Sequence, residues 1–197
     1  MDVWPDPERS AQAMSRLRRA LDEAIAGQHE AKLGLLLAWL AREHALLVGP
    51  PGCGKSRLAV ALMRAAGGES RAVGLHRDST SEELLGPMQI KWVRTPGGRG
   101  LRLRRRTLPG ELRPAELLLL DDLGRAPRET FHALLRVLDA RDRPGPPRQL
   151  TTAIATLHPL GLVSHADPLE PAQLDRFAVQ LRLRGLIADQ CWGDARR

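Results

Sequence analysis

Gly49-Pro50-Pro51-Gly52-Cys53-Gly54-Lys55-Ser56 is the stretch that decides the fold of this chain. It fits the pattern G-x-x-x-x-G-K-[ST] of a phosphate-binding loop, or P-loop. The apolar run at residues 45–48 predicts a buried strand, and residues 57–66 predict a helix that ends at Gly67-Gly68. In this context the glycines turn backbone N–H groups toward phosphate oxygens at a helix N-terminus. We expect residues 49–56 and Arg57 to bind a nucleoside triphosphate, with Lys55 on the β- and γ-phosphates and Ser56 on Mg²⁺.

The composition fits a single globular domain. The chain has 197 residues, of which 43% are hydrophobic, enough to build a core. No apolar run is long enough to span a bilayer, and the N-terminal residues lack the order of a signal peptide. Cys53 and Cys191 are too few for a disulfide framework or a zinc site. We therefore expect a cytoplasmic protein.

The formal net charge of +7 introduces nucleic acid as an alternative partner. Aromatic residues make up only 3% of the chain, which leaves little for stacking on bases. By itself, the charge fits solvated faces better than a nucleic-acid groove.

The order of predicted elements indicates an α/β fold. Two helices precede the P-loop: one carries apolar residues at helical spacing up to Ile25, and the other, at residues 30–42, is apolar on most sides and should be buried. Strands at 71–75, 117–122, 150–155 and 177–183 alternate with helices, one of them a capped start at residues 79–83. This alternation predicts a three-layer P-loop NTPase fold with a mainly parallel, five-stranded sheet.

Residues 88–107 have a different pattern, in which Ile90, Trp92, Leu101 and Leu103 alternate with basic residues around a Pro-Gly-Gly turn. The pattern predicts a two-stranded hairpin with one charged face, which cannot belong to the centre of a sheet.

The strand at residues 117–122 ends in two carboxylates, Asp121 and Asp122. Carboxylates at the C-terminal end of a parallel strand lie at the same sheet edge as the P-loop. We expect Asp121 to hold Mg²⁺ through water, and Asp122 to orient the attacking water. The alternative is a pair of helix-capping aspartates in a surface turn.

Four blocks in this order resemble the MoxR branch of the AAA+ ATPases: the P-loop, residues 117–127, Ala-Thr-Leu-His-Pro at 155–159 and Ala-Gln-Leu-Asp-Arg-Phe at 172–177. The segment Ser-Glu-Glu-Leu-Leu-Gly-Pro at 81–87, with its hairpin, is most similar to the RavA subgroup. The resemblance covers about residues 15–185. It implies an N-terminal helix within 1–26 packed on an AAA+ core at 27–185, with the hairpin as an insert at 88–107.

The resemblance also implies roles for individual residues. Gly27 and Gln28 match the segment that lines the adenine pocket, and the 88–107 hairpin matches an insert that faces the pore of the ring. Residues 141–149 fall where a second hairpin precedes sensor 1. Arg176 matches the arginine finger, which reaches the γ-phosphate bound by a neighbouring subunit. The alternative for Arg176 is a salt bridge with Asp175 or Glu170.

This chain departs from the family at three places. Asp122 stands where the family has Glu, and a carboxylate displaced by about one ångström can slow a reaction about a hundredfold. His158 stands at the sensor 1 Asn, with Thr156 as the other candidate for that role. Residues 186–197 form a short tail, too little for a helical lid, so either the sequence is truncated or another chain supplies the lid, and we name no sensor 2 residue.

Taken together, these features predict a MoxR-like AAA+ ATPase that binds ATP and Mg²⁺ in a ring, with a hexamer expected. It would remodel a protein client, in some cases beside a von Willebrand factor A domain protein. One alternative is a weakly hydrolysing, nucleotide-gated assembly module, which the changes at Asp122 and His158 favour. Another is a nucleic-acid-remodelling AAA+ protein, based on the basic hairpin, and a small-molecule kinase is the remaining one.

Overall fold

Five parallel strands form the central sheet of the chain, in the order β2-β5-β6-β1-β7. The computed structural model describes residues 7–94, 100–107, 110–112, 115–139, 150–159 and 174–185. The strands are β1 (Ala45–Val48), β2 (Ser70–Gly74), β5 (Leu117–Asp121), β6 (Thr152–Leu157) and β7 (Val179–Arg182). Because β1 lies between β6 and β7, the strand order reverses beside it, and ligands bind in such sheets beyond the carboxyl ends of the strands at this switch point.

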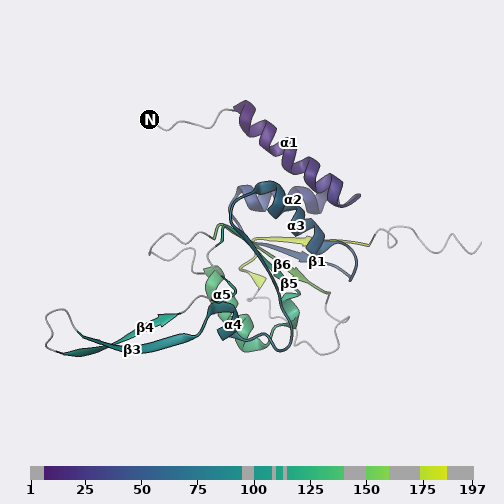
Figure 1. Cartoon of the computed structure of the whole chain (residues 1–197). Coiled ribbons are helices and arrows are strands. Elements are labelled where there is room, and N and C mark those ends of the chain that lie inside the picture. The colour runs from purple at the N-terminus through teal and green to yellow at the C-terminus, as the bar shows by residue number, and fades with distance from the viewer. Residues whose placement is uncertain are drawn as a thin grey trace, which may run out of the picture.

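Helices cover both faces of this sheet, which confirms the predicted α/β fold with three layers (Figure 1). On one face lie α1 (Pro7–Ala24), α2 (His29–Leu40) and α3 (Lys55–Ala66); on the other lie the short α4 (Ser81–Leu85) and α5 (Arg128–Asp139). The alternation of strand side chains divides the core accordingly. Leu47, Leu119 and Ile154 pack with the first group of helices, whereas their neighbours Leu46, Leu118 and Ala153 pack with the second.

A salt bridge joins α1 to α2. Lys32 of α2 is 5% exposed, and its Nζ donates a hydrogen bond of 2.8 Å to Asp22 Oδ1 on α1. Leu17 and Leu21 of α1 are buried in the same core cluster as the α3 residues Leu58 and Leu62. The N-terminal helix is therefore held on the core by both apolar packing and one buried cation. No described helix has the length and apolarity needed to cross a membrane.

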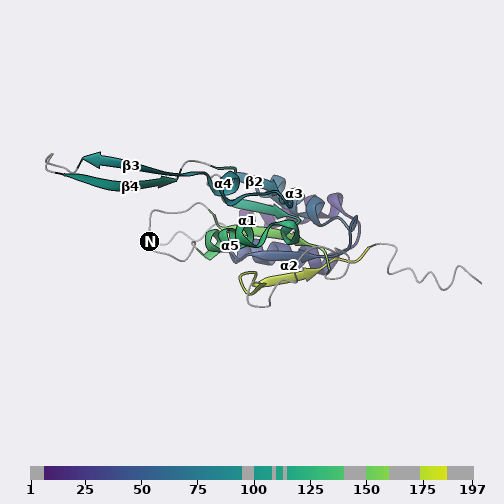
Figure 2. The same ribbon diagram turned by 90° about the horizontal axis from the view of Figure 1, so that it is seen from below.

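The predicted hairpin consists of β3 (Met88–Arg94) and β4 (Leu101–Thr107), which pair antiparallel as a separate sheet. Both views show it extending away from the layered body (Figures 1 and 2). Just before it, Thr80 and Glu83 form the capping box that begins α4, as the sequence predicted.

One expectation about burial was wrong. Helix α2 was predicted to be apolar on most sides and therefore buried, but Leu33, Leu37 and Leu40 are 59%, 54% and 51% exposed. An outer-layer helix places only one face against the sheet, and on α2 this face contains Leu35 and Ala38, both fully buried.

Several element boundaries also differ from those expected. Helix α3 begins at Lys55 rather than at residue 57, because Gly54 already forms its N-cap. Strand β6 runs over Thr152–Leu157 rather than 150–155, since it pairs with β1 up to Val48 opposite Leu157. Strand β7 is shorter than predicted, at Val179–Arg182.

The Asp22–Lys32 pair gives a pH-dependent prediction. The hydrogen bond from Lys32 lowers the pKa of Asp22 below its ordinary value of 3.8. A carboxyl whose pKa is lowered by folding stabilises the fold above its unfolded pKa, and this contribution is lost as the pH falls through the lowered folded value. Asp22→Asn should therefore lower Tm at pH 7 relative to wild type. The difference should vanish at acid pH, and an equal difference at all pH values would contradict this role.

Candidate functional site

The P-loop links β1 to α3 at the carboxyl edge of the sheet. Gly52 and Gly54 have φ angles of 78° and 91°, in the left-handed region that side chains disfavour. Gly54 is the N-cap of α3, so backbone N–H groups at the start of this helix point into the loop. Cys53 within the loop is a free, buried cysteine. The loop conformation and the helix N-terminus together favour a bound phosphate.

Lys55 is folded onto the P-loop itself. Its Nζ donates to Gly49 O at 2.7 Å and to Pro50 O at 2.9 Å, and the residue is only 5% exposed. The two carbonyl oxygens carry no formal charge, so these bonds do not neutralise the buried ammonium. A negatively charged phosphate oxygen would therefore be a stronger partner for Lys55.

Two hydroxyls converge on one oxygen of Asp121. Ser56 Oγ and Thr156 Oγ1 each donate to Asp121 Oδ1 at 2.6 Å. Thr156 lies in β6, between the P-loop strand β1 and the acidic strand β5, and is fully buried. Its hydroxyl oxygen also accepts a hydrogen bond of 2.8 Å from the backbone N–H of Asp122. Thr156 thus contacts both acidic residues.

Asp122 itself adopts a left-handed conformation, with φ 58° and ψ 47°, and so ends the strand one residue earlier than predicted. Its Oδ1 lies 3.1 Å from His158 Nε2, and its Oδ2 lies 3.3 Å from Arg125 Nε. The second nitrogen of His158, Nδ1, is buried and has no hydrogen-bond partner among the described residues. The sensor 1 candidate is therefore placed beside Asp122, and both oxygens of this carboxylate have a basic partner.

The oxygen ligands at this edge suit Mg²⁺. One carboxylate and one hydroxyl within 2.6 Å of each other are hard donors of the kind that bind Mg²⁺ together with substrate phosphates. The described residues contain no cluster of three His, Cys, Asp or Glu side chains that could hold a metal alone. Ser56 and Asp121 would therefore share a metal ion with the phosphates of a nucleotide.

The segment expected to line the adenine pocket lies next to the P-loop. Gly27 and Gln28 have φ angles of 66° and 57°, and Gln28 Nε2 donates to the carbonyl oxygen of Arg184. The preceding Ile25 packs on the loop, since a Cβ added at Gly54 would lie 2.6 Å from Ile25 Cδ1. The segment at residues 25–28 thus contacts both the phosphate-binding loop and Arg184, which follows β7.

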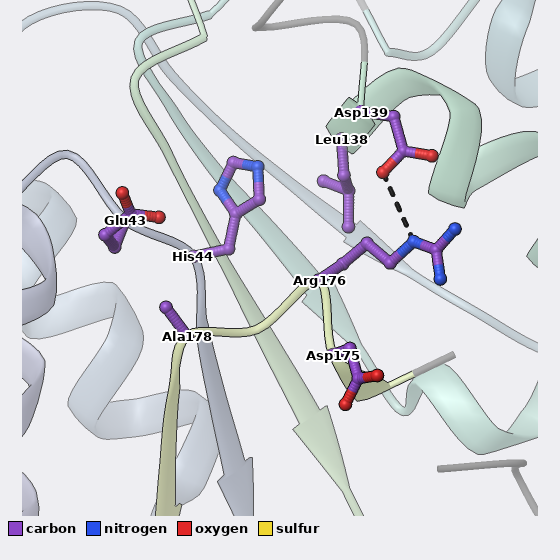
Figure 3. Close-up of a pocket in the computed structure, with 7 residues that line it drawn as sticks. All are labelled: Glu43, His44, Leu138, Asp139, Asp175, Arg176 and Ala178. Atoms are coloured by element: carbon purple, nitrogen blue, oxygen red, sulfur yellow. Dashed lines mark hydrogen bonds and ion pairs between the residues drawn. The ribbon is translucent and has the colours of Figure 1, made fainter. Parts of the chain in front are cut away.

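Arg176 lies before the amino ends of the parallel strands, whereas the P-loop follows the carboxyl end of β1. Its Nε is 3.2 Å from Asp139 Oδ1, at the end of α5 (Figure 3). Of the two partners that the sequence alternative named, Asp175 lies beside Arg176 in the chain and Glu170 lies outside the described residues. A pocket of about 320 Å³ at this place is lined by Arg176, Asp175, Asp139 and by His44 before β1. The four residues of β1 span about 13 Å, so Arg176 cannot reach the P-loop of its own chain.

Sequence reasoning missed one residue of the site and undervalued another. Arg125 received no role, although it stands three residues after Asp122 in a short helical turn, which is the spacing of an i,i+3 ion pair. Thr156 was only the second choice for sensor 1, because His158 is the residue that aligns with the Asn of the family. The expected second hairpin at 141–149, and the tail at 186–197, lie outside the described residues.

Comparisons with known proteins agree with this geometry. The family described as "AAA domain (dynein-related subfamily)" matches residues 44–177. The crystal structure of a candidate ATPase from Cytophaga hutchinsonii superposes with a TM-score of 0.62 at 18% identity, over 89% of this chain and 52% of that chain. At this identity, the similarity shows the shared fold.

Two uncharacterized proteins of Methanocaldococcus jannaschii, MJ0812 and MJ0079, are each 29% identical over 128 residues, which is 65% of this chain. The match covers 33% and 32% of their lengths, so the chain spans about a third of these relatives. The family match covers more than half of the chain and includes the P-loop and both acidic residues. This chain belongs to the AAA domain family, in its dynein-related subfamily.

Proposed function

We propose that this chain binds ATP with Mg²⁺ and hydrolyses the ATP between subunits of a ring. The observation that carries the proposal is that Lys55 lies beyond the carboxyl ends of the parallel strands and Arg176 beyond their amino ends. A single chain therefore has the phosphate-binding loop at one end and the candidate finger at the other. Two copies stacked head to tail would bring Arg176 of one copy to the nucleotide of the next, and repetition of this contact closes a ring.

The chemistry follows from the residues around Asp121. Lys55 and the loop N–H groups would bind the phosphate oxygens, and Ser56 and Asp121 would hold Mg²⁺, which supplies charge neutralisation at the phosphates. Asp122 would orient a water whose oxygen attacks the γ-phosphorus while the bond to the bridging oxygen of ADP breaks. Arg176 from the neighbouring subunit would stabilise the negative charge of the transition state.

Thr156 acts in this scheme as a positioning residue. Its hydroxyl donates to Asp121 and accepts from the backbone of Asp122, so it fixes the metal-binding carboxylate relative to the water-orienting one. A buried hydroxyl that both donates and accepts a hydrogen bond holds these groups more rigidly than an exposed loop contact could.

A second candidate function is a nucleotide-gated assembly module that hydrolyses slowly. This candidate is favoured because both carboxylate oxygens of Asp122 already contact a basic side chain, Oδ1 that of His158 and Oδ2 that of Arg125. The Arg125 side chain is 53% exposed, and salt bridges of this kind contribute about 0–1 kcal/mol. The His158 side chain is only 13% exposed, so His158 is the partner that would keep Asp122 from orienting a water.

The resemblance to MoxR-type and RavA-like proteins supports a finer proposal about the client. We propose that ATP turnover moves the β3–β4 hairpin against a protein client in a chaperone-like reaction. A hexameric ring, a von Willebrand factor A domain partner and a cytoplasmic location are proposed on the same resemblance.

A mixing experiment tests hydrolysis between subunits. We expect Arg176→Ala to lower turnover about a thousandfold, because the transition-state charge loses its partner in trans, while ATP binding persists. Lys55→Ala should also be inactive. A mixture of the two variants should regain part of the activity, since some interfaces then combine an intact loop with an intact finger. Arg136→Ala, on the exposed side of α5, serves as the control. Failure of the mixture to regain activity would argue against a finger acting in trans.

Asp122→Glu distinguishes the two candidate functions. If the shorter carboxylate holds the water too far from the phosphate, the added methylene should raise kcat by up to about a hundredfold with ATP affinity unchanged. A steady-state assay together with nucleotide-binding calorimetry measures both quantities. Slow turnover by wild type and fast turnover by this variant would support the assembly module. Fast turnover by wild type would refute it.

Thr156→Val removes one hydroxyl at nearly constant volume. It leaves Asp121 without one donor and the Asp122 N–H without its acceptor, so we expect kcat to fall about tenfold to a hundredfold. The Mg²⁺ concentration needed for half-maximal turnover should rise as well, which a loss of packing alone would not cause. Thr156→Ser should restore both values. An unchanged Mg²⁺ dependence in the Val variant would contradict the positioning role.

A further inference from the structure

The positive charge of this protein is concentrated in the hairpin. Residues 88–107 contain no Asp or Glu, and their basic residues are Lys91, Arg94, Arg99, Arg102, Arg104, Arg105 and Arg106. The whole chain has 30 basic and 23 acidic residues, so without these seven the two signs are equal in number. The formal net charge of +7 therefore equals the charge of the hairpin, while the body as a whole is neutral.

The hairpin also exposes large apolar side chains. Trp92 is paired directly with Leu103, and the two are 66% and 45% exposed. Ile90, two residues before Trp92 on the same face of β3, is 54% exposed. On the other face lie Lys91 and Arg102, both exposed. An exposed apolar patch on one face, with cations on the other, is typical of a binding surface.

The backbone of the hairpin offers a third feature. Its sheet has two strands, and no other described strand pairs with either of them. The outward edges of β3 and β4 therefore carry backbone groups that an added strand could pair with. A second copy of the same hairpin is disfavoured as that strand, because every approach between copies brings like charges together.

We propose that this hairpin binds an acidic, amphipathic polypeptide segment of a client by adding it as an extended third strand. Backbone hydrogen bonds to an open edge supply affinity, as in other cases of strand addition. Apolar residues of the segment cover the Ile90, Trp92 and Leu103 patch, and its carboxylates lie near the basic residues. The inference names the client chemistry of the function proposed above, and rests on that proposal for the role of the bound segment.

A polypeptide accounts for more of these features than a nucleic acid does. A single strand of DNA or RNA would use the cations and would stack a base on Trp92. It would not use the aliphatic side chains of Ile90 and Leu103 or the open strand edges. An acidic segment with alternating apolar residues uses all three features, and this is why the occupant we infer is a protein.

Fluorescence anisotropy with a defined peptide tests the proposal on the full chain. The probe is a labelled, end-capped peptide of about ten residues that alternates Glu with Val, the length of a long strand. We expect it to bind, and a peptide with Lys in place of Glu not to bind. Methylation of backbone nitrogens on one edge of the probe should weaken binding at least about tenfold, because it removes donors needed for strand pairing.

Charge-reversal variants locate the site. Lys91→Glu combined with Arg102→Glu should weaken binding of the acidic peptide at least about tenfold. Arg64→Glu combined with Arg136→Glu makes the same change of net charge at exposed positions of α3 and α5, and should leave affinity within about twofold. Trp92→Ser should weaken binding with the net charge unchanged. Equal losses in both charge-reversal pairs would overturn the assignment to the hairpin.

Nucleic acid is the competing outcome. If oligo(dT) binds more tightly than the acidic peptide, with an affinity that falls steeply as salt rises, the proposal of a polypeptide partner is overturned. ATP turnover is measured on the same samples. If the chain turns over ATP but does not bind the peptide, only this inference is refuted. If the chain binds the peptide but turns over no ATP, and Arg176→Ala changes nothing, only the proposed hydrolysis is refuted.

Discussion

The site depends on one carboxylate oxygen, Asp121 Oδ1, which accepts hydrogen bonds from Ser56 and Thr156 at 2.6 Å each. These bonds tie the first turn of α3, the end of β5 and the end of β6 to one point. Through Thr156, the same point is linked to the backbone N–H of Asp122. Anything that takes the Ser56 hydroxyl, as a nucleotide-bound Mg²⁺ would, changes the bonding of Asp121 and so reaches Asp122 through two short contacts. In the function proposed above, a change at Asp121 on phosphate binding would be passed by Thr156 to the backbone of Asp122.

The position of Asp122 reflects a balance of small terms. A left-handed backbone costs an ordinary residue about 1–2 kcal/mol, and Asp tolerates it better than most. The bond from its N–H to the buried Thr156 oxygen is of similar size, at about 1 kcal/mol. The half-exposed Arg125 pair adds little. The bond to Thr156 therefore offsets much of the backbone strain and holds the backbone of Asp122 in place, while the weak Arg125 pair leaves one side-chain contact easy to exchange.

Local patterns in the sequence were sufficient for the elements and the architecture, and insufficient for contacts between elements. The apolar runs 45–48 and 117–120 predicted parallel strands because a strand covered on both faces needs apolar residues on both. The same reasoning failed for α2, since an apolar composition does not say which side of a helix has a neighbour. The role of Thr156 depends on β6 lying between β1 and β5, and this strand order is set by the whole chain. The pairing of Arg176 with Asp139 likewise joins residues brought together only by the fold.

The separation of charge between body and hairpin also matters for the assembly we propose. Neutral bodies can pack closely in a ring, because no net repulsion opposes the stacking that brings Arg176 to a neighbouring site. The hairpins repel one another wherever they come within about 8–10 Å, the distance over which salt leaves charges unscreened. In the proposed ring, their cations would therefore keep the hairpins apart, and an acidic segment lying between two of them would remove that repulsion. In such a ring, occupancy of the hairpins would favour a closer arrangement of the same subunits whose interfaces form the nucleotide sites, so client binding and ATP turnover would be coupled through electrostatics alone.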